Sequence, residues 1–162
     1  MKKYLFLDID GALNHLKWNI GLDRRNFKYP YSEFDPECVE NLKHILDETG
    51  AKLVLSSSWR LDPDIHGILS NVGLPYDFEI TTNNLDRHRG SEIKTYLENK
   101  EKPYTYCIID DGDDFLPEQV DNLVITSSGE NGSDDICEMN GGTGLTSKCV
   151  KKAILILNRY ER

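Results

Sequence analysis

The sequence lacks the cysteine pattern of a zinc site or of a small disulfide-stabilised secreted domain. It has four cysteines (Cys38, Cys107, Cys137 and Cys149), and they form neither a Cys-x-x-Cys motif nor a Cys/His metal-binding spacing. Cys107 lies inside an apolar run, as a core thiol would. We therefore expect reduced thiols and a cytoplasmic protein.

Long apolar runs and a net positive charge are also missing. The chain starts with two lysines followed by only four apolar residues before Asp8, which is too short for a signal-peptide core or a membrane span. The formal net charge is −9, and such a charge disfavours general coating of nucleic acid, although a local basic patch is compatible with it. We expect no membrane attachment and no stable protein partner.

The chain does contain a regular alternation of apolar runs and amphipathic stretches. Strands are predicted at 4–7, 53–55, 78–81, 104–109 and 123–125. Helices are predicted from Asp35-Pro36 to Gly50, from Asp62-Pro63 to Gly73, over about 90–99, and after a Thr146 cap. This alternation predicts an α/β fold, a three-layer doubly wound parallel sheet.

Three of the predicted helices have an apolar face, and one of the remaining segments is long. The buried residues are expected to be Val39, Leu42, Ile45 and Leu46 in the first helix, Ile93, Tyr96 and Leu97 in the third, and Val150, Ile154 and Leu157 in the last. Residues 127–144 are rich in Ser, Gly, Asn and Asp and are predicted to form a loop. We expect one domain, 1–162, with a small insertion at about 15–32 and no large cap domain.

Acidic and hydroxyl side chains follow the predicted strands. Asp8 and Asp10 come after the first strand, Ser56 to Ser58 after the second, and Asp110, Asp111, Asp113 and Asp114 after the fourth. In an open α/β sheet the ligand site lies beyond the carboxyl ends of the strands. We therefore expect the carboxylates of Asp8, Asp10 and Asp110 to converge there, whereas Asp113 and Asp114 also suit a turn or a helix cap.

Convergence of carboxylates requires a counter-charge. Two of them about 4 Å apart repel by roughly 4 kcal/mol at an effective dielectric constant of about 20. Oxygen ligands without a nearby His or Cys favour a hard cation, and Mg²⁺ suits a site that is shared with a phosphate. The sequence thus predicts a Mg²⁺ site at this edge of the sheet.

Three segments resemble the motifs of the haloacid dehalogenase superfamily, in the right order. Leu5-Phe6-Leu7-Asp8-Ile9-Asp10-Gly11-Ala12-Leu13-Asn14 is similar to the first motif, Leu53-Val54-Leu55-Ser56 to the second, and Ile108-Ile109-Asp110-Asp111 to the fourth. The third motif, a basic residue, is matched by Arg89 or by Lys94. Ser57-Ser58-Trp59-Arg60 and Arg89-Gly90-x-Glu92-Ile93 resemble one branch, the small phosphatase-like domains of RNA-repair proteins.

The resemblance implies a phosphatase that works through an aspartyl-phosphate. By this resemblance Asp8 is the nucleophile, Asp10 is the general acid and base, and Arg89 balances charge in the transition state. It implies that Ser56, or Ser57 if the strand ends one residue later, donates to a phosphoryl oxygen. It further implies substrate contacts from Gly11, Ser57, Arg60 and Lys94, and Mg²⁺ ligands from Asp8, the Asp10 carbonyl, Asp110 and either Asp111 or Asp114.

Other interpretations of the same residues are open at this stage. Ser56 to Ser58 also suit a helix cap, and Arg89 also suits a surface pair with Glu92. The substrate implied is a phosphorylated molecule, with polynucleotide ends as one candidate. A small-metabolite or nucleotide phosphatase and a non-catalytic binding module with this fold are the alternatives.

The insertion mixes basic and aromatic residues within an acidic chain. These residues are Lys17, Trp18, Arg24, Arg25, Phe27, Lys28, Tyr29 and Tyr31. Basic side chains interleaved with aromatic ones suit backbone phosphates and stacked bases. The alternative is a small flap whose aromatic residues pack on the domain.

Overall fold

The computed structural model describes residues 1–18, 34–82, 88–126 and 142–160. Its strands are β1 (Lys2–Leu7), β2 (Lys52–Leu55), β3 (Glu79–Ile80), β4 (Tyr104–Asp110) and β5 (Leu123–Ile125). Its helices are α2 (Pro36–Thr49), α3 (Ile65–Asn71), α4 (Arg89–Glu98) and α5 (Ser147–Leu157), with 3₁₀ turns η1 (Ser58–Leu61) and η2 (Pro117–Asn122). Residues 127–141 of the predicted loop and 19–32 of the insertion lie outside the described residues.

The strands form one parallel sheet with β1 at its centre. The strand order is β3-β2-β1-β4-β5, and every pairing is parallel. The register sets Leu7 beside Leu55 on one side and beside Ile109 on the other. Asp8 and Ser56, which follow β1 and β2, and Asp110, the last residue of β4, therefore come out side by side at the carboxyl edge.

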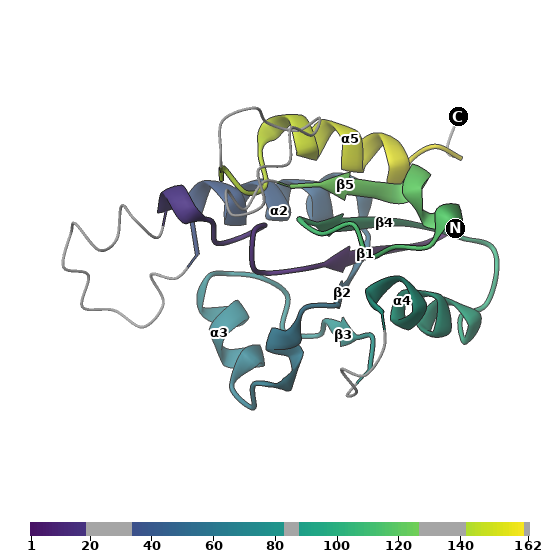
Figure 1. Cartoon of the computed structure of the whole chain (residues 1–162), viewed down its shortest axis with the longest axis horizontal. Coiled ribbons are helices and arrows are strands. Elements are labelled where there is room, and N and C mark those ends of the chain that lie inside the picture. The colour runs from purple at the N-terminus through teal and green to yellow at the C-terminus, as the bar shows by residue number, and fades with distance from the viewer. Residues whose placement is uncertain (19–33, 83–87, 127–141, 161–162) are drawn as a thin grey trace.

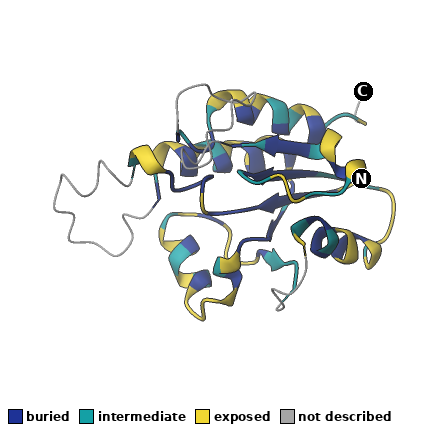
Figure 2. Cartoon of the chain, in the orientation of Figure 1, coloured by how far each residue is buried: buried dark blue, intermediate teal, exposed yellow. Residues whose placement is uncertain are grey.

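Helices cover both faces of the sheet, as predicted for a doubly wound fold (Figure 1). Alternate residues of β1 point to opposite faces: Leu5 and Leu7 join the core under α2, α3 and α5, whereas Tyr4 and Phe6 join a smaller core under α4. Helices α2 and α5 lie side by side (Figure 1). Figure 2 shows the strands buried and the outward faces of the helices exposed. The described residues include no cap domain over the carboxyl edge.

The helix ends follow the sequence signals with one exception, and one predicted core position also differs. Asp35 caps α2 by accepting from the Glu37 amide, and Thr146 caps α5 by accepting from the Cys149 amide. The prediction that Asp62-Pro63 opens a helix is wrong, because Asp62 instead ends η1 and accepts from the Asp64 amide, so α3 begins at Ile65. Ile154 is only half-buried, and the neighbouring Ile156 takes the core position.

We predict that alanine has opposite effects at two uncrowded glycines. Gly50 ends α2 with φ of 62°, so Gly50→Ala should lower the free energy of unfolding by about 1–2 kcal/mol. Gly67 lies inside α3, so Gly67→Ala should raise it by about 0.5–1 kcal/mol. Neither added Cβ meets an atom within 4 Å. Urea unfolding measures both changes. A change of the same sign in the free energy of unfolding of both variants would contradict this account.

Candidate active site

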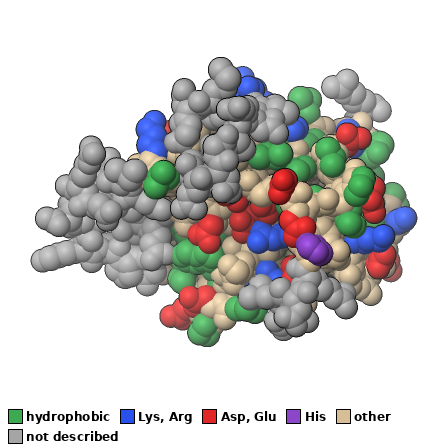
Figure 3. Space-filling model, in the orientation of Figure 1, with side chains coloured by type: hydrophobic (Ala, Val, Ile, Leu, Met, Phe, Trp, Pro, Cys, Tyr) green, Lys and Arg blue, Asp and Glu red, His purple; other side chains and the backbone are tan. Residues whose placement is uncertain are grey.

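Three carboxylates meet at the carboxyl edge, where β1 and β4 end. One oxygen from each of Asp8, Asp110 and Asp111 lies within 4.8 Å of the others. Asp8 and Asp110 are buried, at 6% and 4% exposure, and the Asp8 amide donates to the Ile109 carbonyl. Acidic and basic side chains stand side by side at the centre of the face in Figure 3.

Arg89, the first residue of α4, supplies a positive charge to this cluster. Its Nη1 lies 2.9 Å from Asp8 Oδ1 and 2.7 Å from Asp110 Oδ2. Burial alone would lower the pKa of Arg89, but Asp110 and Asp8 together raise it above its ordinary value. The start of α4 is fixed by Asp114, which accepts from the Arg89 amide through Oδ2.

The single positive charge of Arg89 does not neutralise the three carboxylates. The excess negative charge is reflected in the raised pKa of Asp110. Burial and the neighbouring Asp8 raise the pKa of Asp110 from 3.8 to about 7, although Arg89 opposes the shift. A bound divalent cation would remove this penalty, and an all-oxygen ligand set suits a hard cation such as Mg²⁺. The residues present therefore fit a metal site formed by Asp8, Asp110 and Asp111.

The turn after Asp8 requires glycine. Gly11 has φ of 79°, and a Cβ at this position would overlap the side chain of Asp111. The turn after β1 and the acidic loop after β4 therefore approach each other more closely than any side chain at residue 11 would allow.

The two serines after β2 differ in what their hydroxyls contact. Ser56 is fully buried, and its Oγ has no hydrogen-bond partner among the described residues. Ser57 Oγ accepts from the Trp59 amide as the cap of η1. β2 ends at Leu55, so the structure favours Ser56 as the free donor and gives Ser57 the capping role. A buried hydroxyl without a partner beside Asp8 is a natural donor to an incoming oxygen.

Asp10 does not join the other carboxylates. Its Oδ1 accepts from Asn14 Nδ2 at 2.8 Å, and Trp59 Nε1 donates to both of its oxygens at 3.1 and 3.0 Å. The expectation that the side chains of Asp8, Asp10 and Asp110 share one group is wrong in this respect, because Asp111 takes the third place. Asp10 is exposed, whereas Asp8 is buried.

A comparison of the sequence with known families identifies the architecture. A family model described as the HAD domain in Swiss Army Knife RNA repair proteins matches residues 4–135. The chain belongs to this family. Searches of curated proteins and of solved structures return no match.

Two of the predicted substrate contacts have other partners in this HAD domain. Arg60 is 5% exposed, and its guanidinium donates to the carbonyls of Ser56, Ser57 and Thr82 and to both oxygens of Glu92. These bonds make Arg60 a support of the Ser56–Ser57 turn. Arg60 also lines the cavity that contains Asp8, so its contact with substrate stays a prediction. Lys94 lies on the surface, 3.7 Å from Glu118, and does not line the cavity that contains Asp8. Arg89 is thus the basic residue that the geometry brings to the acids. The alternative of a surface pair with Glu92 is not what the structure shows, because Glu92 pairs with Arg60.

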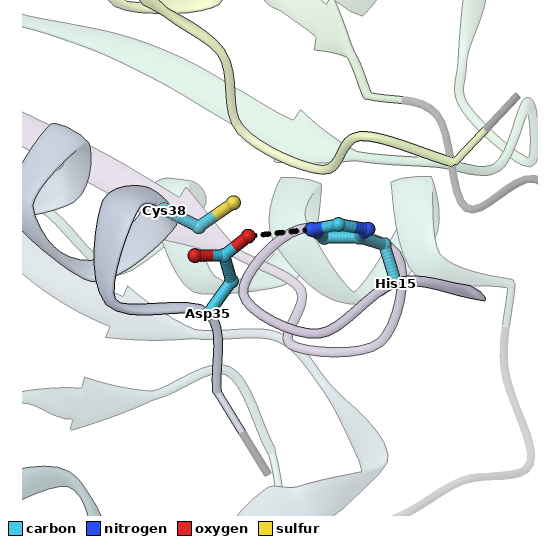
Figure 4. A group of neighbouring side chains, drawn as sticks. All are labelled: His15, Asp35 and Cys38. Atoms are coloured by element: carbon cyan, nitrogen blue, oxygen red, sulfur yellow. Dashed lines mark hydrogen bonds and ion pairs between the residues drawn. The ribbon is translucent and has the colours of Figure 1, made fainter. Parts of the chain in front are cut away.

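A second cluster lies at the base of the insertion, where His15, Asp35 and Cys38 meet (Figure 4). The His15 Nε2 and Asp35 Oδ2 atoms are 2.9 Å apart, and His15 Nδ1 accepts from the Trp18 amide. Nε2 therefore carries the ring hydrogen and donates it to Asp35, which leaves neither nitrogen free to bind a metal. Burial and Asp35 raise the pKa of the Cys38 thiol to about 12, so it stays protonated. This cluster joins His15, at the start of the insertion, to the first turn of α2.

Each of the two clusters lies beside a cavity. A cavity of about 300 Å³ contains Asp8, Arg89, Asp110 and Asp111 among its lining residues. A cavity of about 560 Å³ beside the second cluster is lined partly by Lys17 and Trp18 of the insertion. The other basic and aromatic residues expected to hold nucleic acid (Arg24, Arg25, Phe27, Lys28, Tyr29 and Tyr31) lie outside the described residues. Among the described residues, no helix has both the length and the apolarity to cross a membrane.

Sequence reasoning missed the roles of Trp59, Asn14 and Glu92. All three stand in the segments that carry the family resemblance, so their presence was visible in the sequence. Their partners were not visible, because Glu92 meets Arg60 across 32 positions and Trp59 meets Asp10 across 49.

We predict that the Arg60–Glu92 pair is essential for stability. Glu92→Gln leaves a buried guanidinium without its counter-charge, so it should lower the free energy of unfolding by about 3–5 kcal/mol. The exposed pair of Lys43 and Glu40 provides the control, because Glu40→Gln should change it by less than about 1 kcal/mol. Denaturant unfolding measures both variants, and a Glu92→Gln effect as small as the control's would refute the buried-pair interpretation.

Proposed function

We propose that this HAD domain is a Mg²⁺-dependent phosphomonoesterase in which Asp8 takes the phosphoryl group. The observation that carries the proposal is the meeting of Asp8, Asp110 and Asp111 beside Arg89, in a cavity at the carboxyl edge. Membership of the family supports it, because this fold brings a strand-end aspartate to a phosphate site.

The proposed reaction has two steps. In the first, an Asp8 oxygen bonds to phosphorus, the bond from phosphorus to the ester oxygen breaks, and Asp10 gives a proton to that leaving oxygen. In the second, Asp10 takes a proton from water, whose oxygen attacks phosphorus and releases Asp8. Ser56 Oγ and the Arg89 guanidinium would donate to the phosphoryl oxygens in both transition states.

Asp8, Asp110 and Asp111 would hold the metal ion. A bound Mg²⁺ supplies positive charge that offsets repulsion between the nucleophile and the phosphate. Gly11 supports this assignment, because its missing side chain keeps Asp111 close to the turn after Asp8.

Phosphorylated polynucleotide ends are the substrate class that we propose. The family name refers to RNA repair proteins, and the described residues include no cap domain that would restrict the site to small molecules. Lys17 and Trp18 next to the second cavity add a basic and an aromatic side chain near this edge. The described cysteines Cys38, Cys107 and Cys149 are buried, in keeping with core thiols and a proposed location in the reducing cytoplasm.

A phosphatase screen of matched variants tests the proposal. The panel comprises 3′- and 5′-phosphorylated oligonucleotides, mononucleotides and sugar phosphates, each with and without Mg²⁺. The wild type should release phosphate from an oligonucleotide end faster than from the small molecules. Asp8→Asn should abolish release and still fold, because it removes the nucleophile and relieves charge crowding.

Asp113→Asn is the matched control, since Asp113 is an exposed acid of the same loop. It should keep its activity. Release of phosphate by Asp8→Asn at the wild-type rate would remove Asp8 from the nucleophile role, and a preference for small molecules would favour the metabolite alternative.

We also predict that Mg²⁺ stabilises the protein more at pH 8 than at pH 6. The pKa of Asp110 rises from 3.8 to about 7 on folding, so the stability due to its protonated form is lost as pH rises through this window. The metal binds the ionised form, so its binding competes with the proton. Thermal unfolding with and without Mg²⁺ measures the effect. Asp110→Asn should remove most of the pH dependence, and a larger Mg²⁺ shift at pH 6 would contradict the assignment.

A further inference from the structure

The carboxylate of Asp10 is held by two side chains that the proposed reaction does not yet use. Asn14 Nδ2 donates to Oδ1 at 2.8 Å, and the Trp59 indole donates to both oxygens at 3.1 and 3.0 Å. Asn14 is itself fixed, because its Oδ1 accepts from the Gly11 amide at 3.1 Å and it is buried. Three hydrogen bonds therefore fix the direction in which Asp10 points.

The Trp59 side chain is oriented by its own neighbours. Its amide donates to Ser57 Oγ at the start of η1, immediately after the turn that carries Ser56. Its ring packs against Phe34, with the ring centroids 5.5 Å apart, and Phe34 is buried. The indole is thus anchored by the β2 turn on one side and by the residue that precedes Asp35 on the other.

The different burial of the two aspartates gives this arrangement a chemical meaning. Asp8 is buried, whereas Asp10 is exposed to solvent. In an in-line displacement the leaving oxygen stands on the far side of phosphorus from the nucleophile. The rest of a polymeric substrate stays in solvent, so we take the exposed carboxyl group as the one on the side of the leaving oxygen.

We propose that Trp59, assisted by Asn14, is a positioning residue that aims the Asp10 carboxyl at the leaving oxygen. The inference rests on the proposed function. Trp59 touches neither phosphorus nor the nucleophile in this role. It acts through Asp10, which transfers its proton to the ester oxygen as the bond to phosphorus breaks. The indole N–H contacts both carboxyl oxygens, so it limits rotation of the group that must first give and then take a proton.

The test compares two monoesters that differ in how much they need a proton donor. An alkyl phosphate has a poor leaving group and depends on the general acid, whereas p-nitrophenyl phosphate releases a stable anion and depends on it less. Trp59→Phe keeps a ring against Phe34 but removes the N–H. It should lower kcat/KM by roughly tenfold to a hundredfold for the alkyl ester, a part of what general acid catalysis contributes, and by less than about threefold for the aryl ester.

A second variant and a double-mutant cycle separate positioning from structural support. Asn14→Asp keeps the acceptor for the Gly11 amide but removes the donor to Asp10, so it should show the same dependence on the leaving group. Adding Trp59→Phe to Asp10→Asn should cost less than about twofold on either ester, because Trp59 then has no carboxyl group to aim.

The outcomes separate the proposed phosphatase function from the positioning role of Trp59. A wild type that hydrolyses neither these esters nor a phosphorylated oligonucleotide contradicts the proposed function itself. If only oligonucleotides are hydrolysed, the same comparison is made on oligonucleotides whose terminal phosphate monoester is formed with an alkyl or with a nitrophenyl hydroxyl. If the wild type hydrolyses both, equal losses on the two esters in Trp59→Phe, or the same loss in the Asp10→Asn background, would overturn the role of Trp59 alone. A faster Trp59→Phe enzyme would also overturn it, because the indole would then be holding Asp10 away from the substrate.

Discussion

The structure depends on the electrostatic balance between Arg89 and the two buried carboxylates of Asp8 and Asp110. The parallel sheet brings the ends of β1 and β4 together. Their register pairs Leu7 with Ile109, so the next residues, Asp8 and Asp110, lie side by side. The resulting repulsion is only partly relieved by one guanidinium, as the raised pKa of Asp110 shows. A site with this surplus of negative charge next to a donor arginine and a free serine hydroxyl suits a cation and a phosphate together.

Several features around the site serve to hold these charged groups in place. Gly11 allows the turn after β1 to approach Asp111, and Asp114 fixes the start of α4 that carries Arg89. The buried pair of Arg60 and Glu92 ties the Ser56–Ser57 turn to the same helix. The β2 turn is therefore tied through Arg60 and Glu92 to α4, the helix that begins at Arg89, so we expect a change at Glu92 to disturb both.

The sequence predicted the sheet, the residues at its carboxyl edge and the family, because these follow from local patterns. Apolar runs that end in Asp8, Ser56 and Asp110 mark strands and their termini, and Asp35 and Gly50 mark the ends of α2. The protein partners of Arg60 were beyond prediction, because composition does not tell whether a guanidinium also contacts buried carbonyls. The partner of Asp10 was also beyond prediction, because the contact with Trp59 depends on how η1 folds back over the turn after β1.

The most direct test of the account is to find the residue that carries the phosphoryl group during turnover. Rapid acid quenching of the protein with Mg²⁺ and a phosphorylated substrate, followed by peptide mass spectrometry, would detect a trapped aspartyl-phosphate. The account predicts the added mass of one phosphoryl group on the peptide that contains Asp8, and none in the absence of substrate. Turnover with the label on another residue, or with no labelled Asp8 under any quench condition, would contradict it.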